Sequence, residues 1–584
     1  MEQKYYTVER NVQIMISLLK AHGIKRVIAS PGTTNMTFVG SIQQDPWFEI
    51  YSSVDERSAA YLACGMAEET GEPVVLSCTG ATASRNYLPG LTEAFYRKLP
   101  VIALTSHRGD YRIGHVLDQQ IDRRQSQNDI AVEKVTIPLV KDAEDEQYCI
   151  LQANKAILAL KHRGGGPVHI NMFTKYRLDF SAKELPPVRA IYRFTSFDTL
   201  PELKENLKVA IFVGSHSPFT EEQTKAIDHF CSTRNSVVFC DHTSGYYGKY
   251  RVFFAIPCSQ RNYDSPLRHV DVLIHIGEVS GNAYGMAITS NVVWRVNEDG
   301  ELRDTFGRLN KVFEMPEQYF FSKYALSVEK DDSYLLACKE EYNRLLNRIP
   351  ELPFSNLWMA KIMHDKLPSN CVLHLGILNS LRSWNFFETD ATIRSNSNVG
   401  GFGIDGGLSS LLGASMMHPE KLFFGIFGDL AFFYDMNVLG NRHVGNNVRI
   451  LLINNGKGNE FRNYGHICHQ FGEDADKYMA AAGHYGNKSP DLIRHYATDL
   501  GYRYLTASNK EEFLANLDDF LDPQITEGAI IFEVFTNTPD ESNSIETMLN
   551  FEVDQTVVLR RKITKAVEGT PIESVVNTVR KILR

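Results

Sequence analysis

Two apolar runs in the last third of the chain each have the length and composition of a buried β-strand. They span residues 422–427 and 448–453, and a segment of helix length with mixed polarity separates them. Strands buried on both faces appear as continuous apolar runs, and a helix between two such strands forms a βαβ unit. Because this unit brings the carboxyl ends of its strands to one edge of a sheet, we expect the residues after the two runs to lie close together.

The same alternation of apolar runs and helix-length segments extends over most of the chain, which predicts parallel sheets covered by helices. A chain of 584 residues is also too long for one hydrophobic core. Proline-containing breaks at residues 185–187 and 349–353 divide it. We therefore predict an α/β fold with three doubly wound parallel-sheet domains at residues 1–182, 190–348 and 354–540, and a helical tail at 541–584. The middle domain is Rossmann-like but lacks a GxGxxG fingerprint.

Composition narrows the function classes. The net charge of −9 argues against a general nucleic-acid-binding protein, and no apolar run reaches the length of a membrane span. The first residues lack the apolar segment of a secretory signal. Nine cysteines occur without C-x-x-C pairs, which favours reduced thiols. We expect a cytoplasmic protein that binds neither membranes nor nucleic acid.

Polar residues follow both apolar runs. Asp429 offers a carboxylate and Asn455 an amide oxygen, and the glycine-flanked Lys457 offers its main-chain carbonyl. Oxygen ligands of this kind suit Mg²⁺, which combines few protein ligands with phosphate oxygens. Gly428 would let a diphosphate approach the backbone. Gly-Asp and Asn-Asn are also ordinary turn dipeptides, but the strand before each pair favours the metal site.

The sequence Gly428-Asp429-Leu430, followed by Asn454-Asn455, resembles the GDG…NN signature of thiamine-diphosphate enzymes, with leucine in the third position. Within that group it is similar to the 2-succinyl-5-enolpyruvyl-6-hydroxy-3-cyclohexene-1-carboxylate synthases of menaquinone synthesis (the MenD family). The resemblance implies thiamine diphosphate and Mg²⁺ as cofactors. It also implies pyrimidine-binding, central and diphosphate-binding domains in that order. Carried over, the family's metal ligands are Asp429, Asn455 and the main chain of Lys457.

The segment VDERSA at residues 54–59 resembles the family segment that carries the catalytic glutamate, which here is Glu56. In the family, this carboxyl contacts N1′ of the aminopyrimidine and favours the tautomer whose N4′ removes the C2 proton. An apolar pocket would raise the proton affinity of such a carboxyl group. The alternative is an acidic residue that only stabilises the start of a helix. We predict that Glu56 is catalytic.

Further site residues follow from the resemblance. In GIDG at residues 403–406, Ile404 matches the aliphatic side chain that separates the two cofactor rings, although it also fits a core position. Gly80 would permit close approach of the cofactor or substrate, and Asn86 is either a cofactor contact or a helix cap. Gln119 matches an active-site glutamine, with Gln120 as the alternative register. The other implied cofactor contacts are Thr33, Ser380, Gly403, Gly428, Leu430 and Ala431.

The substrate residues depart from the MenD family pattern. Arg108, in Thr-Ser-His-Arg, matches an arginine that binds a substrate carboxylate, although it also fits a solvated surface position. Thr34 stands where the family has an arginine, and Trp384, with Arg382 nearby, replaces another. Residues 395–398 contain no arginine, although the family has a third arginine in this segment. Candidates for a proton donor near the metal loop are Glu460, His466 and His469, unless the histidines are surface residues. We predict altered substrate specificity.

These patterns predict decarboxylation of a 2-oxo acid with transfer of the resulting acyl anion to an unknown acceptor. An acetolactate-synthase-like enzyme and a simple decarboxylase of the phosphonopyruvate or sulfopyruvate type remain alternatives. So do a flavin or nicotinamide oxidoreductase that uses the middle domain, and a non-catalytic binding protein with this fold. The resemblance further implies a homodimer or homotetramer, in which the cofactor lies between the first domain of one subunit and the third domain of another.

Overall fold

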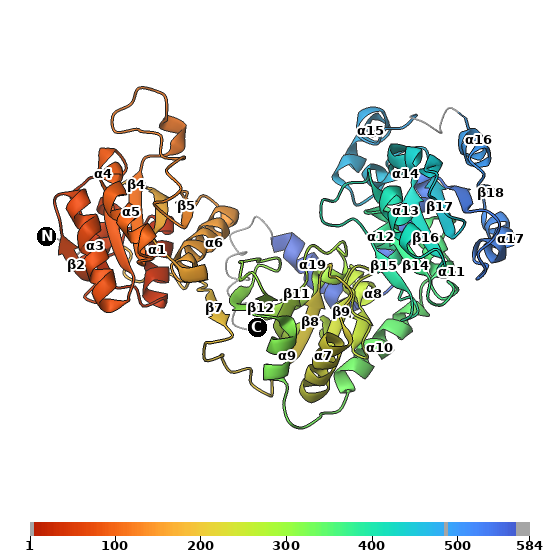
Figure 1. Ribbon diagram of the computed structural model, residues 1–584, viewed down its shortest axis with the longest axis horizontal. Helices are drawn as coiled ribbons and strands as arrows, with labels where there is room; N and C mark the ends of the chain where they lie inside the picture. Colours follow the sequence, from red (N-terminus) through yellow and green to blue (C-terminus); the bar gives the residue numbers. More distant parts are fainter. Residues whose placement is uncertain (1–4, 484–488, 568–584) are drawn as a thin grey trace. The chain divides into compact units, whose positions relative to one another are not determined.

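The structure is a computed structural model that describes residues 5–483 and 489–567 (Figure 1). Its contacts divide the chain into two compact units. Unit 1 comprises Met1–Thr199, Asp299–Arg303 and Leu309–Glu314, and unit 2 comprises Leu200–Glu298, Asp304–Arg308 and Met315–Arg584. The main sheets are parallel and helix-covered, which confirms the predicted α/β class. The predicted domain boundaries remain predictions.

Unit 1 is built on a six-stranded parallel sheet with the strand order β2-β1-β3-β4-β6-β5. Its strands are β1 (Arg26–Ala29), β2 (Glu49–Ser52), β3 (Val74–Thr79), β4 (Val101–His107), β5 (Glu133–Ile137) and β6 (Val168–Phe173). Its helices are α1 (Arg10–Ala21), α2 (Met36–Ile42), α3 (Glu56–Thr70), α4 (Thr82–Asn86), α5 (Leu88–Tyr96) and α6 (Ala143–Ala159). Strand β7 (Tyr192–Thr195) pairs in parallel with β13 (Leu309–Glu314).

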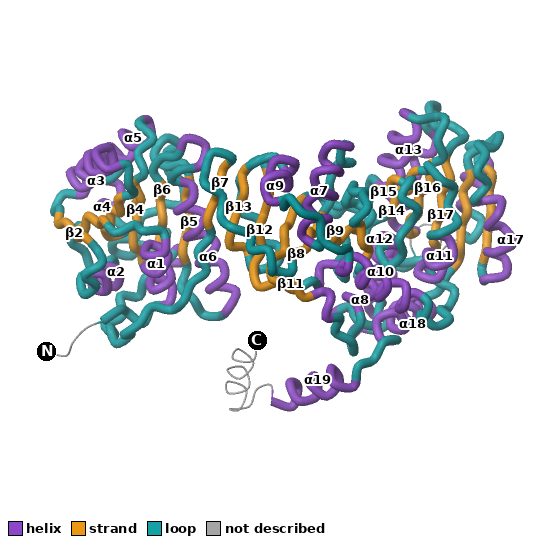
Figure 2. Tube along the Cα trace, turned by 90° about the horizontal axis from the view of Figure 1, so that it is seen from below, coloured by secondary structure: helices purple, strands orange, loops and turns teal. Residues whose placement is uncertain are grey.

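The sheet of unit 1 has a hydrophobic core on each face. Val75 and Ile102 pack with residues of α1 and α6, whereas their neighbours Leu76 and Ala103 pack with α3 and α5. Successive side chains of a strand point to opposite faces, so two cores require strands that are apolar throughout. Figure 2 shows α3 and α5 on one side of this sheet and α1 and α6 on the other.

The first part of unit 2 contains five neighbouring parallel strands in the order β10-β9-β8-β11-β12. They are β8 (Val209–Val213), β9 (Val237–Cys240), β10 (Arg251–Phe253), β11 (His269–Ile276) and β12 (Thr289–Asn297). The helices of this part are α7 (Glu221–Arg234), α8 (Ala255–Ser259), α9 (Glu317–Tyr324) and α10 (Ser333–Leu346).

The second part of unit 2 holds a six-stranded parallel sheet in the order β15-β14-β16-β17-β19-β18. Its strands are β14 (Val372–Leu375), β15 (Arg394–Asn396), β16 (Phe423–Gly428), β17 (Val448–Asn454), β18 (Arg503–Ala507) and β19 (Ile530–Phe535). Its helices are α11 (Asn356–Met363), α12 (Asn379–Trp384), α13 (Gly407–Met417), α14 (Asp429–Asp435), α15 (Asp474–Tyr478), α16 (Leu492–Asp499) and α17 (Lys510–Phe520).

The predicted βαβ unit is confirmed, because β16 and β17 are parallel neighbours with Gly428 opposite Ile453. The single crossover helix that the sequence predicted is instead two pieces. Helix α14 ends at Asp435, and a tighter 3₁₀ segment, Met436–Gly440, continues from it. The register places the chain after Gly428 beside the chain after Asn454. The candidate metal residues therefore leave the sheet at the same edge.

The C-terminal region forms α18 (Thr538–Asn550) and α19 (Gln555–Val567), and residues 568–584 of the predicted helical tail lie outside the described part. Helix α18 packs on the body of unit 2, where Arg261 Nη1 lies 2.7 Å from Glu546 Oε1. All nine cysteines are free.

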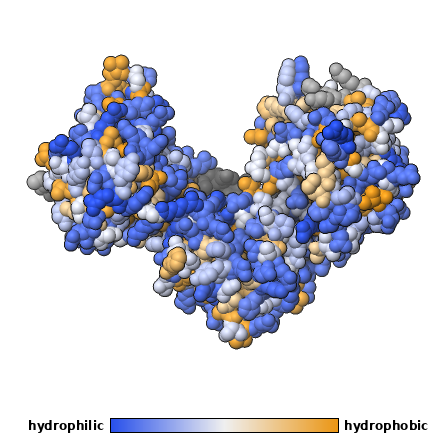
Figure 3. Space-filling view, in the orientation of Figure 1, coloured by the Kyte–Doolittle hydropathy of each residue, from blue (hydrophilic) through white to orange (hydrophobic). Residues whose placement is uncertain are grey.

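No helix in the described ranges is long and apolar enough to cross a bilayer. Figure 3 shows a mostly hydrophilic face with hydrophobic side chains in small separate groups.

Candidate active site

The carboxylate of Asp429 forms the centre of the site in unit 2. Asp429 follows β16 directly, and its side chain is only 4% exposed. Its Oδ2 accepts hydrogen bonds from the backbone amides of Asn455 at 3.2 Å, Gly456 at 2.6 Å and Lys457 at 3.1 Å. Burial raises the pKa of Asp429 to about 6, and the amide donors oppose that rise. A cation beside the carboxylate would favour its charged form.

Asn455 supplies an oxygen that the protein leaves unused. Its Oδ1 is buried and has no hydrogen-bond partner. An unpaired buried acceptor costs about 1–3 kcal/mol, so such an atom in a folded protein calls for a ligand. The Lys457 ammonium group is engaged by Asp476 Oδ2 at 2.7 Å. Lys457 therefore has its main-chain carbonyl, not its side chain, to offer to the site.

These groups fit a magnesium ion bound together with a diphosphate. Within the described ranges there is no cluster of three or more His, Cys, Asp or Glu that would hold a metal alone. One carboxylate, one amide oxygen and one carbonyl leave coordination positions for phosphate and water, as Mg²⁺ prefers. A Cβ added to Gly428 would meet no atom within 4 Å, so the strand end borders open space. The partly buried Leu430 and Ala431 follow it on α14.

The other predicted cofactor residues of unit 2 lie after neighbouring strands of the same sheet. Ser380 is buried on α12, after β14, and its hydroxyl accepts a hydrogen bond from Asn356 Nδ2 at 3.1 Å. Gly403 and Ile404 lie in the segment between β15 and α13, where Gly403 is exposed and Ile404 is partly buried. The predicted role of Ile404 between two cofactor rings remains a prediction.

Three predicted substrate residues line one cavity in unit 2. Arg382 of α12, Glu460 and His466 border a space of about 310 Å³ together with Tyr284 from the first part of the unit. Arg382 forms an ion pair with Glu460. His466 Nδ1 accepts a hydrogen bond from the Cys468 amide at 3.1 Å. The structure therefore groups these residues, but Glu460 already neutralises the charge of Arg382.

Glu56 and Asn86 meet at the edge of unit 1. Glu56 is the first residue of α3, where Asp55 caps the helix by accepting a hydrogen bond from the Arg57 amide at 3.0 Å. Asn86 ends α4, and its Nδ2 donates to Glu56 Oε2 at 3.1 Å. Asn86 therefore orients the predicted catalytic carboxyl group and does not cap the following helix. The other carboxylate oxygen, Oε1, is left for a ligand.

Arg108, Gln119 and Thr33 have different surroundings in unit 1. The Arg108 side chain is 19% exposed, which excludes the fully solvated alternative, and its Nη1 lies 3.3 Å from Asp118 Oδ2. Its guanidinium lies over the ring of Tyr176 at 5.5 Å. Gln119 is exposed with a φ of 54°, and Thr33 is exposed in the loop after β1. The roles predicted for these three residues remain predictions.

Thr34 and Gly80 contribute to packing around β4. Thr34 is 4% exposed, and its hydroxyl donates to the Ser106 carbonyl at 2.8 Å. A Cβ added to Gly80 would lie 2.7 Å from that same Ser106 oxygen and 2.8 Å from Arg123 Nη2. Gly80 thus permits the close approach of a neighbouring strand and of an arginine. The hydroxyl of Thr34 is directed into the domain and does not replace the missing arginine.

The comparisons with known proteins agree with this geometry. Residues 10–127 match the family described as thiamine pyrophosphate enzyme, N-terminal TPP binding domain. The 2-succinyl-5-enolpyruvyl-6-hydroxy-3-cyclohexene-1-carboxylate synthase of Bacteroides thetaiotaomicron is 30% identical over 559 residues, which cover 91% of this chain and 97% of that protein. The chain belongs to the MenD family.

Other MenD family proteins show the same extent of similarity. The Phocaeicola vulgatus synthase is 29% identical over 559 residues, covering 91% of this chain and 96% of that protein. A solved structure, the thiamine diphosphate-dependent 4-hydroxybenzoylformate decarboxylase of Rhodococcus jostii RHA1, has 14% identity and a TM-score of 0.38, and covers 90% of this chain and 99% of that one. As a member of the MenD family, the protein is a thiamine-diphosphate-dependent enzyme.

The sequence did not single out two charged groups that the structure removes wholly or partly from solvent. Glu541 of α18 is buried, and its Oε1 accepts a hydrogen bond from the Asn356 amide at 3.1 Å. Burial raises the pKa of Glu541 to about 7, and Asp429 adds to that rise. The second is Arg123. Its neighbour Arg124 makes the pair look like surface charge in the sequence, and no local pattern distinguishes them.

We predict that Gly80→Ala lowers the melting temperature and disturbs the position of Arg123. The added methyl would contact the Ser106 carbonyl, a backbone atom that cannot turn away, and overpacking of this kind costs about 1–3 kcal/mol. Thermal unfolding measures the effect. Gly413→Ala in α13 is the matched control, because its added Cβ meets nothing within 4 Å. Equal melting temperatures for the two variants would contradict the prediction.

Proposed function

We propose that this MenD family member is a thiamine-diphosphate- and Mg²⁺-dependent carboligase that decarboxylates a 2-oxo acid and transfers the acyl anion to an acceptor. The observation that carries the proposal is the unpaired, buried Oδ1 of Asn455, on the residue whose amide bonds the Asp429 carboxylate. These oxygens and the Lys457 carbonyl would hold the metal. Backbone groups at Gly428, Leu430 and Ala431 would adjoin the diphosphate.

Thiamine diphosphate, when bound, supplies the carbon nucleophile and the electron sink for decarboxylation. The protein has to hold a proton at the right ring nitrogen. Glu56 is suited to this because Asn86 fixes one carboxylate oxygen, which leaves the other to share a proton with N1′. Ile404 would support the bent shape of the cofactor. Gln119 would contact the substrate near the reacting atoms.

Assembly into a homodimer or homotetramer would complete the site, with unit 1 of one copy facing the metal site of another. The start of α3 supports this proposal, because Tyr61 and Leu62 are 48% and 49% exposed on the helix that begins at Glu56. Exposed apolar side chains of this size beside a functional residue are typical of an interface. The middle strands of unit 2 would then have a structural role.

The donor is proposed to be a 2-oxo acid whose carboxylate binds Arg108, and the natural substrates are proposed to differ from those of menaquinone synthesis. Arginine pairs with carboxylates through two parallel hydrogen bonds. The charge of Arg382 is neutralised by Glu460, and Thr34 offers no charge. This set lacks the cations that two multi-carboxylate substrates require. The acceptor is proposed to be a small molecule, which assays with different acceptors would identify.

A panel of 2-oxo acids tests the proposal when CO₂ release is measured with thiamine diphosphate and Mg²⁺ present. We expect release from at least one 2-oxo acid, and Arg108→Gln should raise its KM at least tenfold. Isochorismate with 2-oxoglutarate should give no comparable product. Efficient turnover of that pair would refute the altered specificity. No CO₂ release from any acid would refute the catalytic proposal, and yellow purified protein would favour a flavin oxidoreductase.

A further inference from the structure

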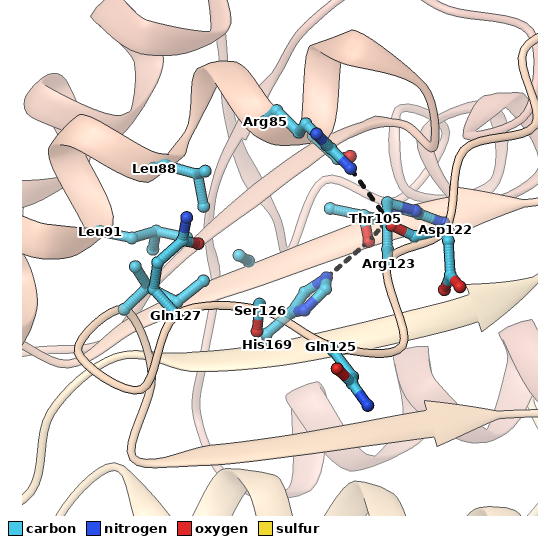
Figure 4. Close-up of a pocket in the computed structure, with 13 residues that line it drawn as sticks. Arg85, Leu88, Leu91, Thr105, Asp122, Arg123, Gln125, Ser126, Gln127 and His169 are labelled. Carbon is cyan, nitrogen blue, oxygen red and sulfur yellow. Dashed lines mark hydrogen bonds between the residues drawn. The ribbon is translucent and has the colours of Figure 1, made fainter.

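A cavity in unit 1 adjoins Gly80, because a Cβ added to Gly80 would lie 2.8 Å from Arg123 Nη2, and Arg123 lines the cavity. It has a volume of about 390 Å³ and is bounded by α4, α5, two strands and the segment at residues 122–130 (Figure 4). Thr105 of β4 and His169 of β6 form its floor. Neither Glu56 nor Arg108 lines it. The roles proposed for Glu56 and Arg108 therefore do not account for this cavity.

The lining of this cavity is divided between apolar and charged groups. Leu88 and Leu91 of α5 form an apolar wall of the cavity together with Ile130. Figure 4 shows that the two leucines lie away from Arg85 and Arg123. Arg85 and Arg123 lie near Asp122 and Thr105. A pocket that combines an apolar wall with a few converging polar groups is the usual form of a small-molecule site.

Arg123 is a charged residue of the cavity that lacks a carboxylate partner within the described ranges. Its Nη1 donates to Thr105 Oγ1 at 2.9 Å, and within the described ranges it forms no ion pair with a carboxylate. Burial lowers the pKa of Arg123 to about 10, so the guanidinium is desolvated but still charged at neutral pH. A buried charge without a counter-charge is costly unless something else supplies one.

The groups around Arg123 supply only part of the missing negative charge, since Asp110 favours the charged form of Arg123 without forming an ion pair with it. The nearby carboxylate of Asp122 is bound by Arg124, with Nη2 at 2.7 Å and Nε at 3.0 Å. Arg85 donates to the Asp122 carbonyl at 3.3 Å and adds a second positive charge. His169 Nε2 lies 2.8 Å from Thr105 Oγ1, and burial lowers the pKa of His169 to about 3, so it is neutral. With three arginines (Arg85, Arg123 and Arg124) and two aspartates (Asp110 and Asp122), this end of the cavity carries a net positive charge.

We propose that this cavity is a binding site for a small organic monocarboxylate with a compact apolar body, whose carboxylate binds the guanidinium of Arg123. Arg85 reinforces the positive potential at the mouth, and the leucines of α5 with Ile130 enclose the apolar body. Arginine suits this task because its planar fork matches a carboxylate. The proposal does not require the proposed function, because Arg123, Arg85 and the leucines of α5 are not among the residues proposed to hold the metal, the diphosphate or the donor acid.

Benzoate is a suitable probe, and benzamide is its uncharged counterpart of the same shape. Both are titrated by calorimetry into the full chain with thiamine diphosphate and Mg²⁺ present, so that the proposed active site is occupied. We expect saturable benzoate binding at least tenfold tighter than benzamide binding. Arg123→Gln should weaken benzoate at least tenfold, while Arg123→Lys should retain part of the affinity.

Two further variants separate charge from shape. Arg97→Gln removes the same charge from an exposed arginine of unit 1 that does not line the cavity, and it should bind benzoate as the unchanged chain does. Leu88→Phe narrows the apolar end without changing any charge and should weaken benzoate at least fivefold. The proposal is overturned if benzoate shows no saturable binding up to about 20 mM, if benzamide binds equally well, or if Arg97→Gln weakens binding as much as Arg123→Gln. Melting temperatures confirm that each variant is folded.

Discussion

Glu56→Gln is expected to lower catalytic turnover by a factor of about 10²–10⁴, the usual contribution of a positioned proton-transferring group. Glutamine keeps the shape of the side chain and can still accept the hydrogen bond from Asn86, so the start of α3 should remain intact. What it loses is the carboxylate that we propose to share a proton with the cofactor ring. The direct measurement is the rate of C2-proton exchange of bound thiamine diphosphate.

Two controls make the Glu56 result specific. Glu69→Gln changes the same residue type at the exposed far end of α3 and should leave exchange and turnover unchanged. Asn86→Ala keeps the carboxylate but removes the group that orients it, and should lower kcat by about tenfold with an unchanged melting temperature. If Glu56→Gln exchanges the C2 proton as fast as the unchanged chain, another group activates the cofactor and the assignment is wrong.

Asn455→Ala is expected to remove the stabilisation that thiamine diphosphate and Mg²⁺ give to the folded protein. At a ligand concentration of one hundred times Kd this stabilisation amounts to about 2.7 kcal/mol. The ligand-free protein should lose little, because the Asn455 Oδ1 makes no hydrogen bond within the protein. Melting curves with and without the two ligands measure the difference. An undiminished ligand-dependent shift in this variant would exclude Asn455 as a metal ligand.

Asp429→Asn should have the same effect on the ligand-dependent shift and should also destabilise the ligand-free protein. The Asp429 side chain accepts hydrogen bonds from four backbone amides, at Leu430, Asn455, Gly456 and Lys457. An amide group offers one acceptor oxygen where the carboxylate offers two. Asp518→Asn, on the exposed face of α17, is the matched control. Comparing Asn455→Ala with Asp429→Asn separates ligand binding from folding.

The sequence predicted the strands well because a short, continuous apolar run has few structural interpretations other than a buried strand. The run at 422–427 is displaced from β16 by one residue, and the run at 448–453 is one residue shorter than β17. The split between α14 and its 3₁₀ continuation was not predicted, because both pieces have the same local composition. The resemblance supplied Glu56 and Asn86 as site residues. Their mutual hydrogen bond joins positions 30 residues apart and depends on tertiary structure.

The groups that the sequence missed share one physical property: they are charged residues whose burial is created by distant segments. Arg123 lies against Thr105 of β4 and beside Gly80, and Glu541 lies against the start of α11. None of these segments adjoins its charged residue in the chain. The reverse error concerns Thr34, whose position in the family pattern pointed to a substrate, whereas its hydroxyl bonds the Ser106 carbonyl.

Helix α4 has only five residues, and two consecutive ones face different neighbours: Arg85 borders the cavity of unit 1, while Asn86 donates to Glu56. A compound bound against Arg85 would therefore contact the same short helix that orients Glu56, the residue proposed to be catalytic. An inhibitor that binds this cavity is therefore expected not to compete with thiamine diphosphate, and a high coenzyme concentration should not reduce its binding.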